Sequence, residues 1–248
     1  TYTDVDVTVS GSVGGANPCL HIGGLFGIDV ASTTALTVSN SYAHGDILVN
    51  NSNGATSLGG LGGSGLGTSL SNAYSSGSLT LVDATMDSQR IGGLIGAIGG
   101  DNLEISNVFS VSQITAPDLT PGIGGTFGVG KGGLFGVWQT STQNISISGA
   151  YYDVARIGQA NCFGVKLNFI GLPTVVDGSN FNGLCTAKND AGVEPNYFIN
   201  NSTNAPLSAW NFSNIWKIRT VTYPDFVGEA VVATPSPTPT PTSTVNPT

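Results

Sequence analysis

The sequence predicts an all-β fold in which short strands coil into a β-solenoid. Three observations support this prediction. The chain has 248 residues with 36 Gly, many β-branched residues and a single Met, a composition that favours turns and strands over helix. Apolar residues make up 40% of the chain, which is enough to build a core. In addition, two short motifs alternate along the chain in a fixed order, which is typical of repeat architectures.

The first motif is a glycine pair followed by apolar residues, and the second is a Ser-Asn or Ser-Gly pair that precedes an aromatic residue. The first motif recurs at Gly23–Gly27, Gly59–Gly62, Gly92–Gly96 and Gly132–Gly136, and the second at Ser39–Tyr42, Ser71–Tyr74, Ser106–Phe109 and Ser148–Tyr151. Their spacing predicts tandem units of about 35 residues. The units cover residues 22–58, 59–91, 92–131 and 132–153, after a partial unit over residues 1–21.

Each element of a unit has an expected physical role. The glycines let two backbone segments approach closely or turn a corner with positive φ. Short alternating strands such as Leu36–Ser39 and Leu103–Ser106 follow. A unit of this size cannot bury its own faces, so neighbouring units must stack and share a core. The expected core residues are Leu25, Phe26, Tyr42, Leu61, Tyr74, Leu94, Ile95, Phe109, Leu134, Phe135 and Tyr151.

The two motifs together resemble the GLUG motif, which occurs in tandem on bacterial surface proteins, including some IgA-protease-like peptidases. The resemblance covers about residues 22–153, and Trp210–Ile218 with Tyr223–Phe226 is similar to the segment that often closes such arrays. The sequence departs from the motif at Gly62, where an apolar residue is expected, at Phe109–Val111, and in an additional block over Gly124–Gly128. The resemblance implies a surface or scaffold role and carries no catalytic residues.

The remaining segments lack the repeat. Residues 154–233 are expected to form a cap over the last coil, and residues 234–248, where Thr and Pro alternate, an extended tail. Cys162 and Cys185 are candidates for a disulfide that closes a loop of about 24 residues. Cys19 is then either a small buried apolar residue or an intermolecular partner. Sequons for N-glycosylation place acceptors at Asn50, Asn144, Asn200, Asn201 and Asn211.

Charge and composition exclude several classes of function. Charged residues are 9% of the chain and the net charge is -8, so no basic stripe is present to bind nucleic acid or an anionic membrane. No apolar run approaches the ~18 residues of a transmembrane helix. The N-terminus does not look like a signal peptide, which fits a mature chain or an excised fragment.

Residues that could carry chemistry are few. His21 and His44 are the only histidines, and no Gly-x-Ser-x-Gly nucleophile motif accompanies them, so we expect no catalytic site. Asp4 and Asp6 alternate on one strand and form a weak Ca²⁺ candidate. We otherwise expect no metal and no cofactor.

The expected function is that of a non-enzymatic, secreted structural subunit. The partial first unit opens on alternating Val5, Val7 and Val9, and an uncapped β-coil is a template for another chain. Head-to-tail contact with a second copy would give an extracellular filament or sheath. Two alternatives are an adhesive or spacer module of a larger cell-surface protein and a carbohydrate-binding β-helix. Exposed Trp or Tyr rings along one face would favour sugar binding.

Overall fold

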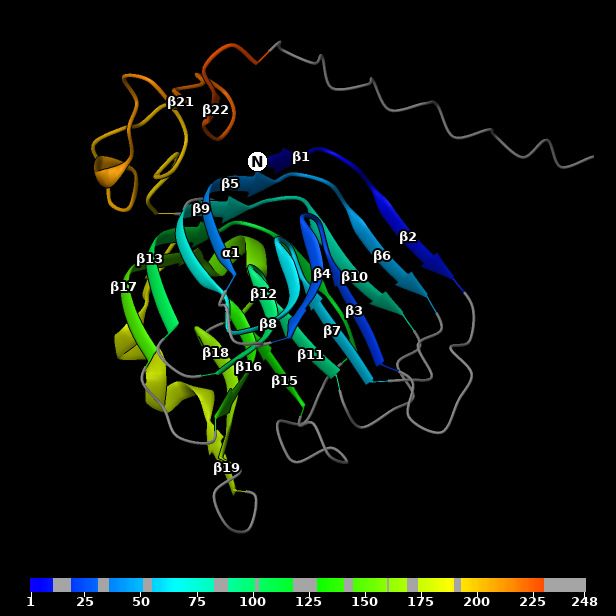
Figure 1. The fold of residues 1–248 in the computed structure, drawn as a ribbon. Coiled ribbons are helices and arrows are strands. Elements are labelled where there is room, and N and C mark those ends of the chain that lie inside the picture. Colours follow the sequence, from blue (N-terminus) through cyan, green and yellow to red (C-terminus); the bar gives the residue numbers. More distant parts are fainter. Residues whose placement is uncertain are drawn as a thin grey trace, which may run out of the picture.

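Parallel β-sheets make up most of the molecule. The structure is a computed structural model, and it describes residues 1–10, 19–30, 36–50, 55–82, 89–100, 103–117, 129–140, 145–159, 161–168, 174–189 and 193–229. Strands dominate these segments, and they run side by side along the body of the molecule (Figure 1). The predicted all-β class is therefore confirmed. The Thr/Pro-rich residues 234–248 lie outside the described part of the chain.

Four sheets contain nearly all the strands. Sheet A comprises β1 (Tyr2–Thr3), β5 (Thr37–Ala43), β9 (Ser69–Ser75), β13 (Leu103–Ser110), β17 (Ile145–Asp153) and β20 (Thr186–Lys188). Sheet B comprises β2 (Val7–Ser10), β6 (Ile47–Asn50), β10 (Ser78–Val82) and β14 (Gln113–Thr115). Sheet C comprises β3 (Cys19–Gly23), β7 (Ala55–Gly59), β11 (Gln89–Gly92) and β15 (Gly130–Gly132). Sheet D comprises β4 (Phe26–Val30), β8 (Gly62–Leu66), β12 (Ile95–Gly99), β16 (Phe135–Thr140), β18 (Phe163–Asn168) and β19 (Thr174–Asp177).

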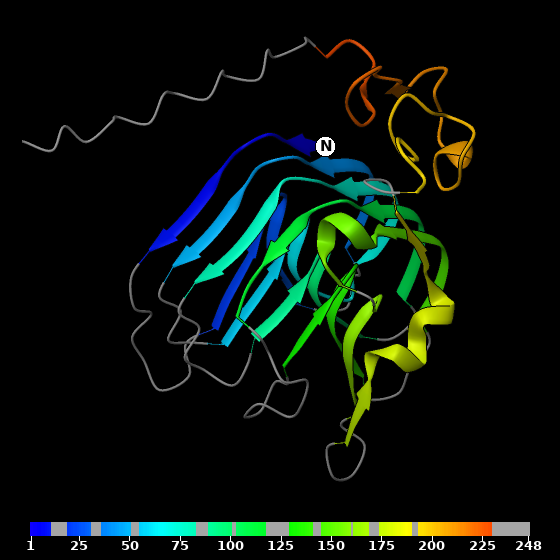
Figure 2. The ribbon, with the colours of Figure 1, turned by 180° about the vertical axis from the view of Figure 1, so that it is seen from behind.

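The chain visits the sheets in the order A, B, C, D and then returns to sheet A one strand further along. Each passage makes one coil, and successive coils pair in parallel, as Figure 2 shows from the opposite side. The register aligns equivalent motif residues: Tyr42 pairs with Tyr74, and Phe109 with both Tyr74 and Tyr151. Stacked parallel coils are the arrangement expected of a β-solenoid.

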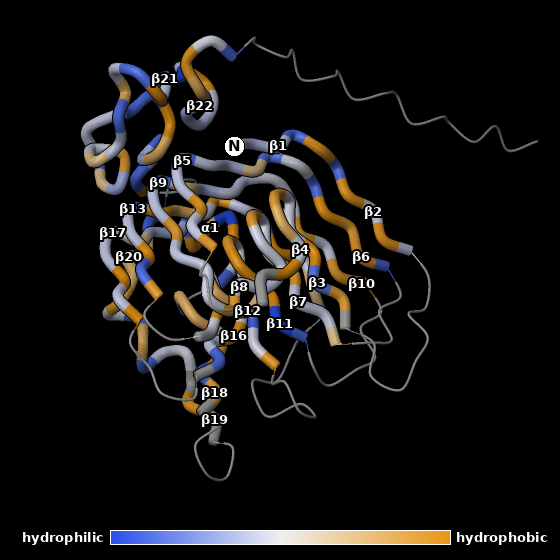
Figure 3. Tube along the Cα trace, in the orientation of Figure 1, coloured by the Kyte–Doolittle hydropathy of each residue, from blue (hydrophilic) through white to orange (hydrophobic). Residues whose placement is uncertain are grey.

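The interior holds two main hydrophobic clusters. One lies between sheets A and D and includes Leu70, Ile105 and Phe135. The other lies between sheets B and C and includes Ile47 and Leu58. Apolar and polar residues alternate along the strands, so one face of each strand enters a cluster. Figure 3 shows the apolar residues that recur along the strands of sheets B and C.

The glycine motif forms the corner between sheets C and D. Only two residues, such as Gly93–Leu94, link a strand of sheet C to the next strand of sheet D. The leucine of each link enters the cluster between sheets A and D, where Leu61, Leu94 and Leu134 are fully buried. The first glycine of the motif leaves no room for a side chain. A Cβ on Gly92 would overlap the carbonyl oxygens of Ile95 and Leu134, so only glycine fits there.

The first coil differs slightly from the others at this corner. Leu25 and Phe26 are half-buried because no further coil covers them in the described chain. The ring of Phe26 occupies the space where a side chain at Gly62 would lie. This arrangement explains why the second unit tolerates glycine at a position where the other units carry Phe or Ile.

The Ser-Asn pair of the second motif changes the direction in which side chains point. Asn40, Asn72 and Asn107 have φ of 46°, 49° and 53°, and Gly149 has φ of 59° at the equivalent position. A left-handed residue interrupts the two-residue alternation of a strand, because its neighbours no longer point to opposite faces in sequence. The residue two positions before the left-handed residue and the residue one position after it therefore both face the interior. The aromatic residue that follows faces outward from sheet A.

We expect the identity of the residue at this position to determine coil stability. Replacing Asn72 by Ala should lower the free energy of unfolding by about 1–2 kcal/mol, the cost of a left-handed conformation for a residue with Cβ and no polar side chain. Replacing it by Gly should cost less, because glycine adopts this conformation freely. Urea unfolding followed by circular dichroism compares the two variants. If the Ala variant proved as stable as the Gly variant, the left-handed residue would not control the fold.

The coil geometry continues beyond residue 153, where we expected the repeats to end. The helix α1 (Val154–Ile157) follows β17, and β18 then extends sheet D. The Gly133 and Leu134 N–H groups donate to the carbonyls of Asn161 and Cys162 over 2.7 and 3.0 Å. Asn161–Cys162 thus takes the place of a Gly-Leu link, and Cys162 is buried in the same cluster as Leu134. Residues 154–168 contain no glycine pair, so the repeated motif does not reveal this additional coil.

Residues 193–229 form a separate layer, which we call the flank segment. It contains only the 3-10 turn η2 (Leu207–Ala209) and the short strands β21 (Trp216–Lys217) and β22 (Asp225–Phe226). Figures 1 and 2 both show it beside β1, β5 and β9 rather than over the last coil. The residues expected to form a cap thus lie in two places: those after residue 154 continue the stack of coils, and the flank segment lies along its side. The reason lies in the outward-facing aromatic rings of sheet A.

Candidate functional sites: an aromatic ladder and an open first coil

The outer face of sheet A carries a row of stacked aromatic rings, which we call the aromatic ladder. The rings of Tyr2, Tyr42, Tyr74, Phe109 and Phe198 follow one another with centroid separations of 5.2, 5.2, 4.6 and 4.5 Å. The first four come from successive coils, and Phe198 comes from the flank segment. Parallel strands lie about 4.8 Å apart, so the coil spacing itself places these rings in stacking contact.

The sequence did not reveal two residues of the ladder, Tyr2 and Phe198, and it suggested Tyr151, which lies outside the ladder. Tyr2 pairs with Tyr42 and belongs to the ladder, although the partial unit lacks a recognisable Ser-Asn pair. Tyr151 is half-buried and stacks at 6.3 Å on Tyr197, whereas Phe198 takes the place on Phe109. The expectation of Tyr151 as a core residue is corrected accordingly. The adjacent Tyr152 is the buried residue.

The flank segment covers the ladder with its own rings. The ring centroid of Trp210 lies 5.6 Å from that of Phe109 and 6.0 Å from that of Tyr74. The ring centroid of Trp216 lies 6.0 Å from that of Tyr42. Trp210 Nε1–H also donates to the Asn107 carbonyl over 3.1 Å. All three tryptophans of the chain are buried. The rings therefore build a hydrophobic core between two layers instead of an exposed binding face.

Polar groups join the two layers at one end of the ladder. The hydroxyl of Tyr42 donates to the Glu229 carboxylate, and that of Tyr74 donates to the Pro224 carbonyl over 2.7 Å. The His44 ring contacts the Tyr74 hydroxyl through Nε2. Burial raises the pKa of Tyr74 well above its ordinary value. Burial also lowers the pKa of His44, although the carboxylates of Asp225, Asp4 and Glu229 oppose this shift. Both groups are therefore neutral at pH 7.

The two histidines lie in different parts of the described structure. His44 lies between β5 and β6 and contacts the ladder, while His21 lies in β3 at the corner of sheets C and D. Burial, together with the Arg90 charge, lowers the pKa of His21. His44 thus packs against the ladder, and His21 is half-buried in an edge strand of the first coil.

Asp6, one of the two carboxylates of the calcium candidate, has a structural role. The Asp6 carboxylate accepts the Asp46 N–H over 2.9 Å, and the Asp46 carboxylate accepts the Ser78 N–H over 2.7 Å. These residues occupy equivalent positions of three coils, because Val7, Ile47 and Leu79 pair in register. The carboxylates therefore bind the backbone of the next coil. Within the described segments, no group of three His, Cys, Asp or Glu residues could hold a metal ion.

The first coil presents the edges of all four sheets. The strands β1, β2, β3 and β4 each end a sheet in the part of the chain that the structure describes. Val5 is 60% exposed and Tyr2 is 46% exposed. Val7 and Val9 point into the cluster between sheets B and C but are only half-buried. Apolar side chains and unpaired backbone edges thus coincide at this end.

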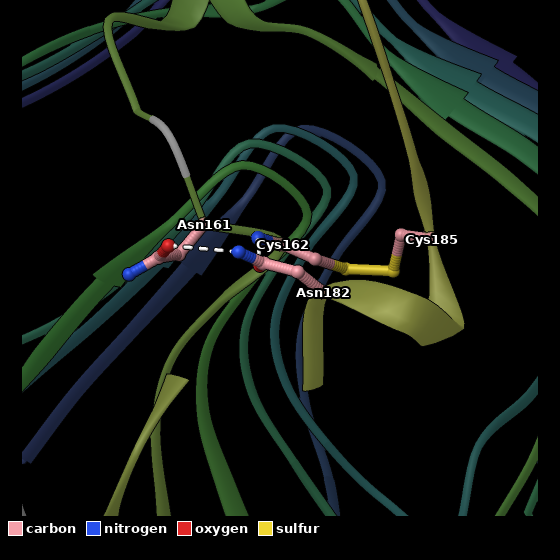
Figure 4. The surroundings of a disulfide bond; sticks show 4 residues. All are labelled: Asn161, Cys162, Asn182 and Cys185. Carbon is pink, nitrogen blue, oxygen red and sulfur yellow. Dashed lines mark hydrogen bonds between the residues drawn. A yellow bond between two sulfur atoms is a disulfide. The ribbon is translucent and has the colours of Figure 1, made fainter. Parts of the chain in front are cut away.

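The last coil is covered in part, although β20, β14, β15 and β19 end the four sheets there within the described residues. The helix α1 packs near β14, and β19 pairs antiparallel with β18 at the edge of sheet D. The 3-10 helix η1 (Gly178–Leu184) lies against β18. A disulfide joins Cys162 to Cys185, and Asn182 donates to Asn161 over 3.0 Å beside it (Figure 4). This pair is the one that the sequence suggested; the side chain of Cys19 lies outside the described residues.

The glycosylation sequons have mixed surroundings. Asn50, Asn200 and Asn211 are exposed, whereas Asn144 lies outside the described residues. The side-chain oxygen of Asn201 accepts the N–H groups of Thr203 and Asn204 over 2.7 and 2.8 Å. That of Asn211 accepts the N–H groups of Ser213 and Asn214 at 3.1 Å. Both side chains therefore stabilise local turns.

Comparison with family models finds no match to this sequence, and comparisons with curated proteins and with solved structures find none either. The GLUG resemblance therefore stays a prediction from the motifs. Among the described residues, no helix is both long and apolar enough to span a membrane.

Proposed function

We propose that the chain is a secreted, non-enzymatic structural subunit that assembles through its first coil. The observation that carries this proposal is the coincidence of four sheet edges with exposed apolar side chains at the first coil of the described chain. The N–H and C=O groups of an edge strand that face away from the sheet lack partners, and pairing with another strand satisfies them. Four such edges on one surface offer many more backbone hydrogen bonds than a single edge strand.

Apolar side chains at the first coil favour the same contact. Val7 and Val9 are half-buried, and Val5 is 60% exposed. Burial of apolar surface contributes about 25 cal/mol per Å², so a covering chain would gain both hydrophobic contact and hydrogen bonds.

The receiving surface in this proposal is the edge of β20 in sheet A. β20 pairs on one side with β17, and its residues Thr186 and Ala187 are exposed. If β1 of the next copy pairs with β20, sheet A continues from one subunit to the next. The two contacting surfaces differ, so the assembly does not close and grows as a filament. A disulfide in the chain fits an oxidising, extracellular setting.

Charge at the first coil should abolish assembly. We expect the double variant Val5→Lys with Val7→Lys to stay monomeric at concentrations where the unaltered chain forms larger species, because lysines at an edge must be desolvated on pairing. The matched control is Leu48→Lys in β6, an exposed residue of the second coil away from the edge. Sedimentation velocity over a concentration series measures the outcome, and circular dichroism checks the fold. A chain that is monomeric at every concentration would rule out the filament.

A second candidate is supported by the partial cover that α1, β19 and η1 give to the last coil. The chain also suits a spacer or adhesive module of a larger cell-surface protein, as the GLUG resemblance implies. This module would be monomeric in sedimentation and would resist unfolding without associating. A sugar-binding β-helix receives less support, because all three tryptophans and the ladder residues Tyr42, Tyr74 and Phe109 are buried.

A further inference from the structure

The flank segment is a separable layer. Its buried side chains Phe198, Leu207, Trp210, Trp216 and Tyr223 form one hydrophobic cluster with the outer face of sheet A. None of them belongs to the clusters between sheets A and D or between sheets B and C. Release of the flank segment would therefore uncover the aromatic ladder but leave both interior clusters of the solenoid in place. Local opening of this kind requires only the contacts of one layer to break.

The polar contacts of this layer converge on His44. The Tyr74 hydroxyl has one proton, which it donates to the Pro224 carbonyl of the flank segment. It therefore accepts the hydrogen bond from the His44 Nε2–H group. This assignment leaves Nδ1 of His44 without a proton while the ring is neutral. The His44 ring also lies 4.5 Å from the Tyr42 ring and 5.3 Å from the Tyr74 ring.

We propose that mild acid releases the flank segment from the aromatic ladder, and that His44 is the group that takes up the proton. Uptake at Nδ1 places a positive charge beside the buried rings of Tyr42 and Tyr74. The release of the segment gives the charged imidazole access to water. The proposal is independent of how the first coil assembles.

Three carboxylates face His44, and they limit how far burial lowers its pKa. Asp4 lies in the link before β2, Asp225 in β22, and Glu229 at the end of the described flank segment; all three favour the charged ring. Asp225 is also paired with Arg219, and Glu229 accepts hydrogen bonds from Tyr42 and from the Phe226 N–H. Burial outweighs the three carboxylates, so the pKa of His44 is lowered overall.

The direction of the pH dependence follows from this shift. The covered state binds a proton at His44 less readily than the released state, in which the pKa returns toward its ordinary value of about 6.5. The contribution of neutral His44 to the covered state is complete above that pH and is lost as the pH falls below it. At a pH below the pKa values of both states, each unit by which the pKa is lowered changes the ratio of released to covered chains tenfold.

Two of the three tryptophans report on the flank segment. Trp210 and Trp216 belong to it, while Trp138 lies in sheet D. In a Trp138→Phe background, acrylamide quenching of fluorescence should rise several-fold as the pH falls from 7.5 toward 5, while the far-UV circular dichroism of the solenoid stays constant. A further His44→Gln substitution should abolish this rise between pH 7.5 and 5, because glutamine can donate to Tyr74 but takes up no proton. His21→Gln is the matched control and should keep the acid response.

The outcomes separate the proposal from general acid unfolding. It is overturned if quenching does not change, if the circular dichroism signal is lost at the same pH, or if His44→Gln responds at the same pH as His21→Gln. If His44→Gln does not fold, NMR titration replaces it. The chain has two histidines, so the His21→Gln variant leaves one imidazole resonance. Its titration midpoint must coincide with the quenching midpoint, and separate midpoints would equally overturn the proposal.

Discussion

Replacing Gly92 by Ala is expected to abolish the native fold or to destabilise it by more than about 3 kcal/mol, the upper end of the range for overpacking. The new Cβ would overlap the carbonyl oxygens of Ile95 and Leu134 and lie 2.7 Å from the Gly136 nitrogen. All three atoms belong to backbone, and Leu134 and Gly136 lie in the following coil. No side-chain rotation can relieve the overlap, so two coils would have to separate at the corner.

A matched variant isolates this effect from the general consequences of a Gly-to-Ala change. Gly183 lies in η1, and a Cβ built there meets no atom within 4 Å. Gly183→Ala should therefore have nearly unaltered stability. Thermal and urea unfolding followed by circular dichroism compare the two variants. Equal stability would mean that the corner between sheets C and D is looser than the structure shows.

The second large effect concerns the aromatic ladder. Tyr74 is fully buried, and its ring stacks on Tyr42 from one side and on Phe109 from the other. Tyr74→Ala should lower the free energy of unfolding by about 3–5 kcal/mol, as is typical of a large aromatic residue lost from a core. The total stability of a domain is about 5–15 kcal/mol, so this variant should be marginally folded.

Two comparisons divide the effect of Tyr74 into its parts. Tyr74→Phe keeps the ring but leaves the Pro224 carbonyl without its donor, and it should cost about 1–3 kcal/mol. Tyr2→Ala removes a ladder ring that is 46% exposed and stacked on one side only, so it should cost less than Tyr74→Ala. Chemical denaturation of the four proteins gives the order. If Tyr2→Ala were as damaging as Tyr74→Ala, stacking between coils would not explain the stability of the ladder.

The sequence alone was sufficient to predict the all-β class. Few helix formers, abundant glycine and alternating strands leave little other choice for the backbone. The motif spacing also aligned the residues that pair between coils, such as Tyr42 with Tyr74. These features depend on local composition and on periodicity, both of which can be read without knowledge of distant contacts.

The face of sheet A on which the aromatic rings lie could not be read in the same way. Simple alternation places Tyr42 on the same face as Val38, but the left-handed Asn40 between them reverses the phase. The recurring Asn before the aromatic residue was the available signal. Recognising it would have predicted an outward row of rings, and such a row requires a cover. The position of Trp210 and Trp216 over that row follows from contacts across about a hundred residues of chain, which no local pattern contains.

The links between strands vary in length at one corner far more than at the others. Sheets C and D are always joined by two residues in the four complete coils, whereas sheets B and C are joined by eight, four, six and fourteen residues. The four sheets keep their register despite this variation. Sequence length can thus be added between sheets B and C without disturbing the stack. Since the strand ends at this corner lie one above another, peptides grafted into successive links would be anchored in a row, with their attachment points about one strand spacing apart.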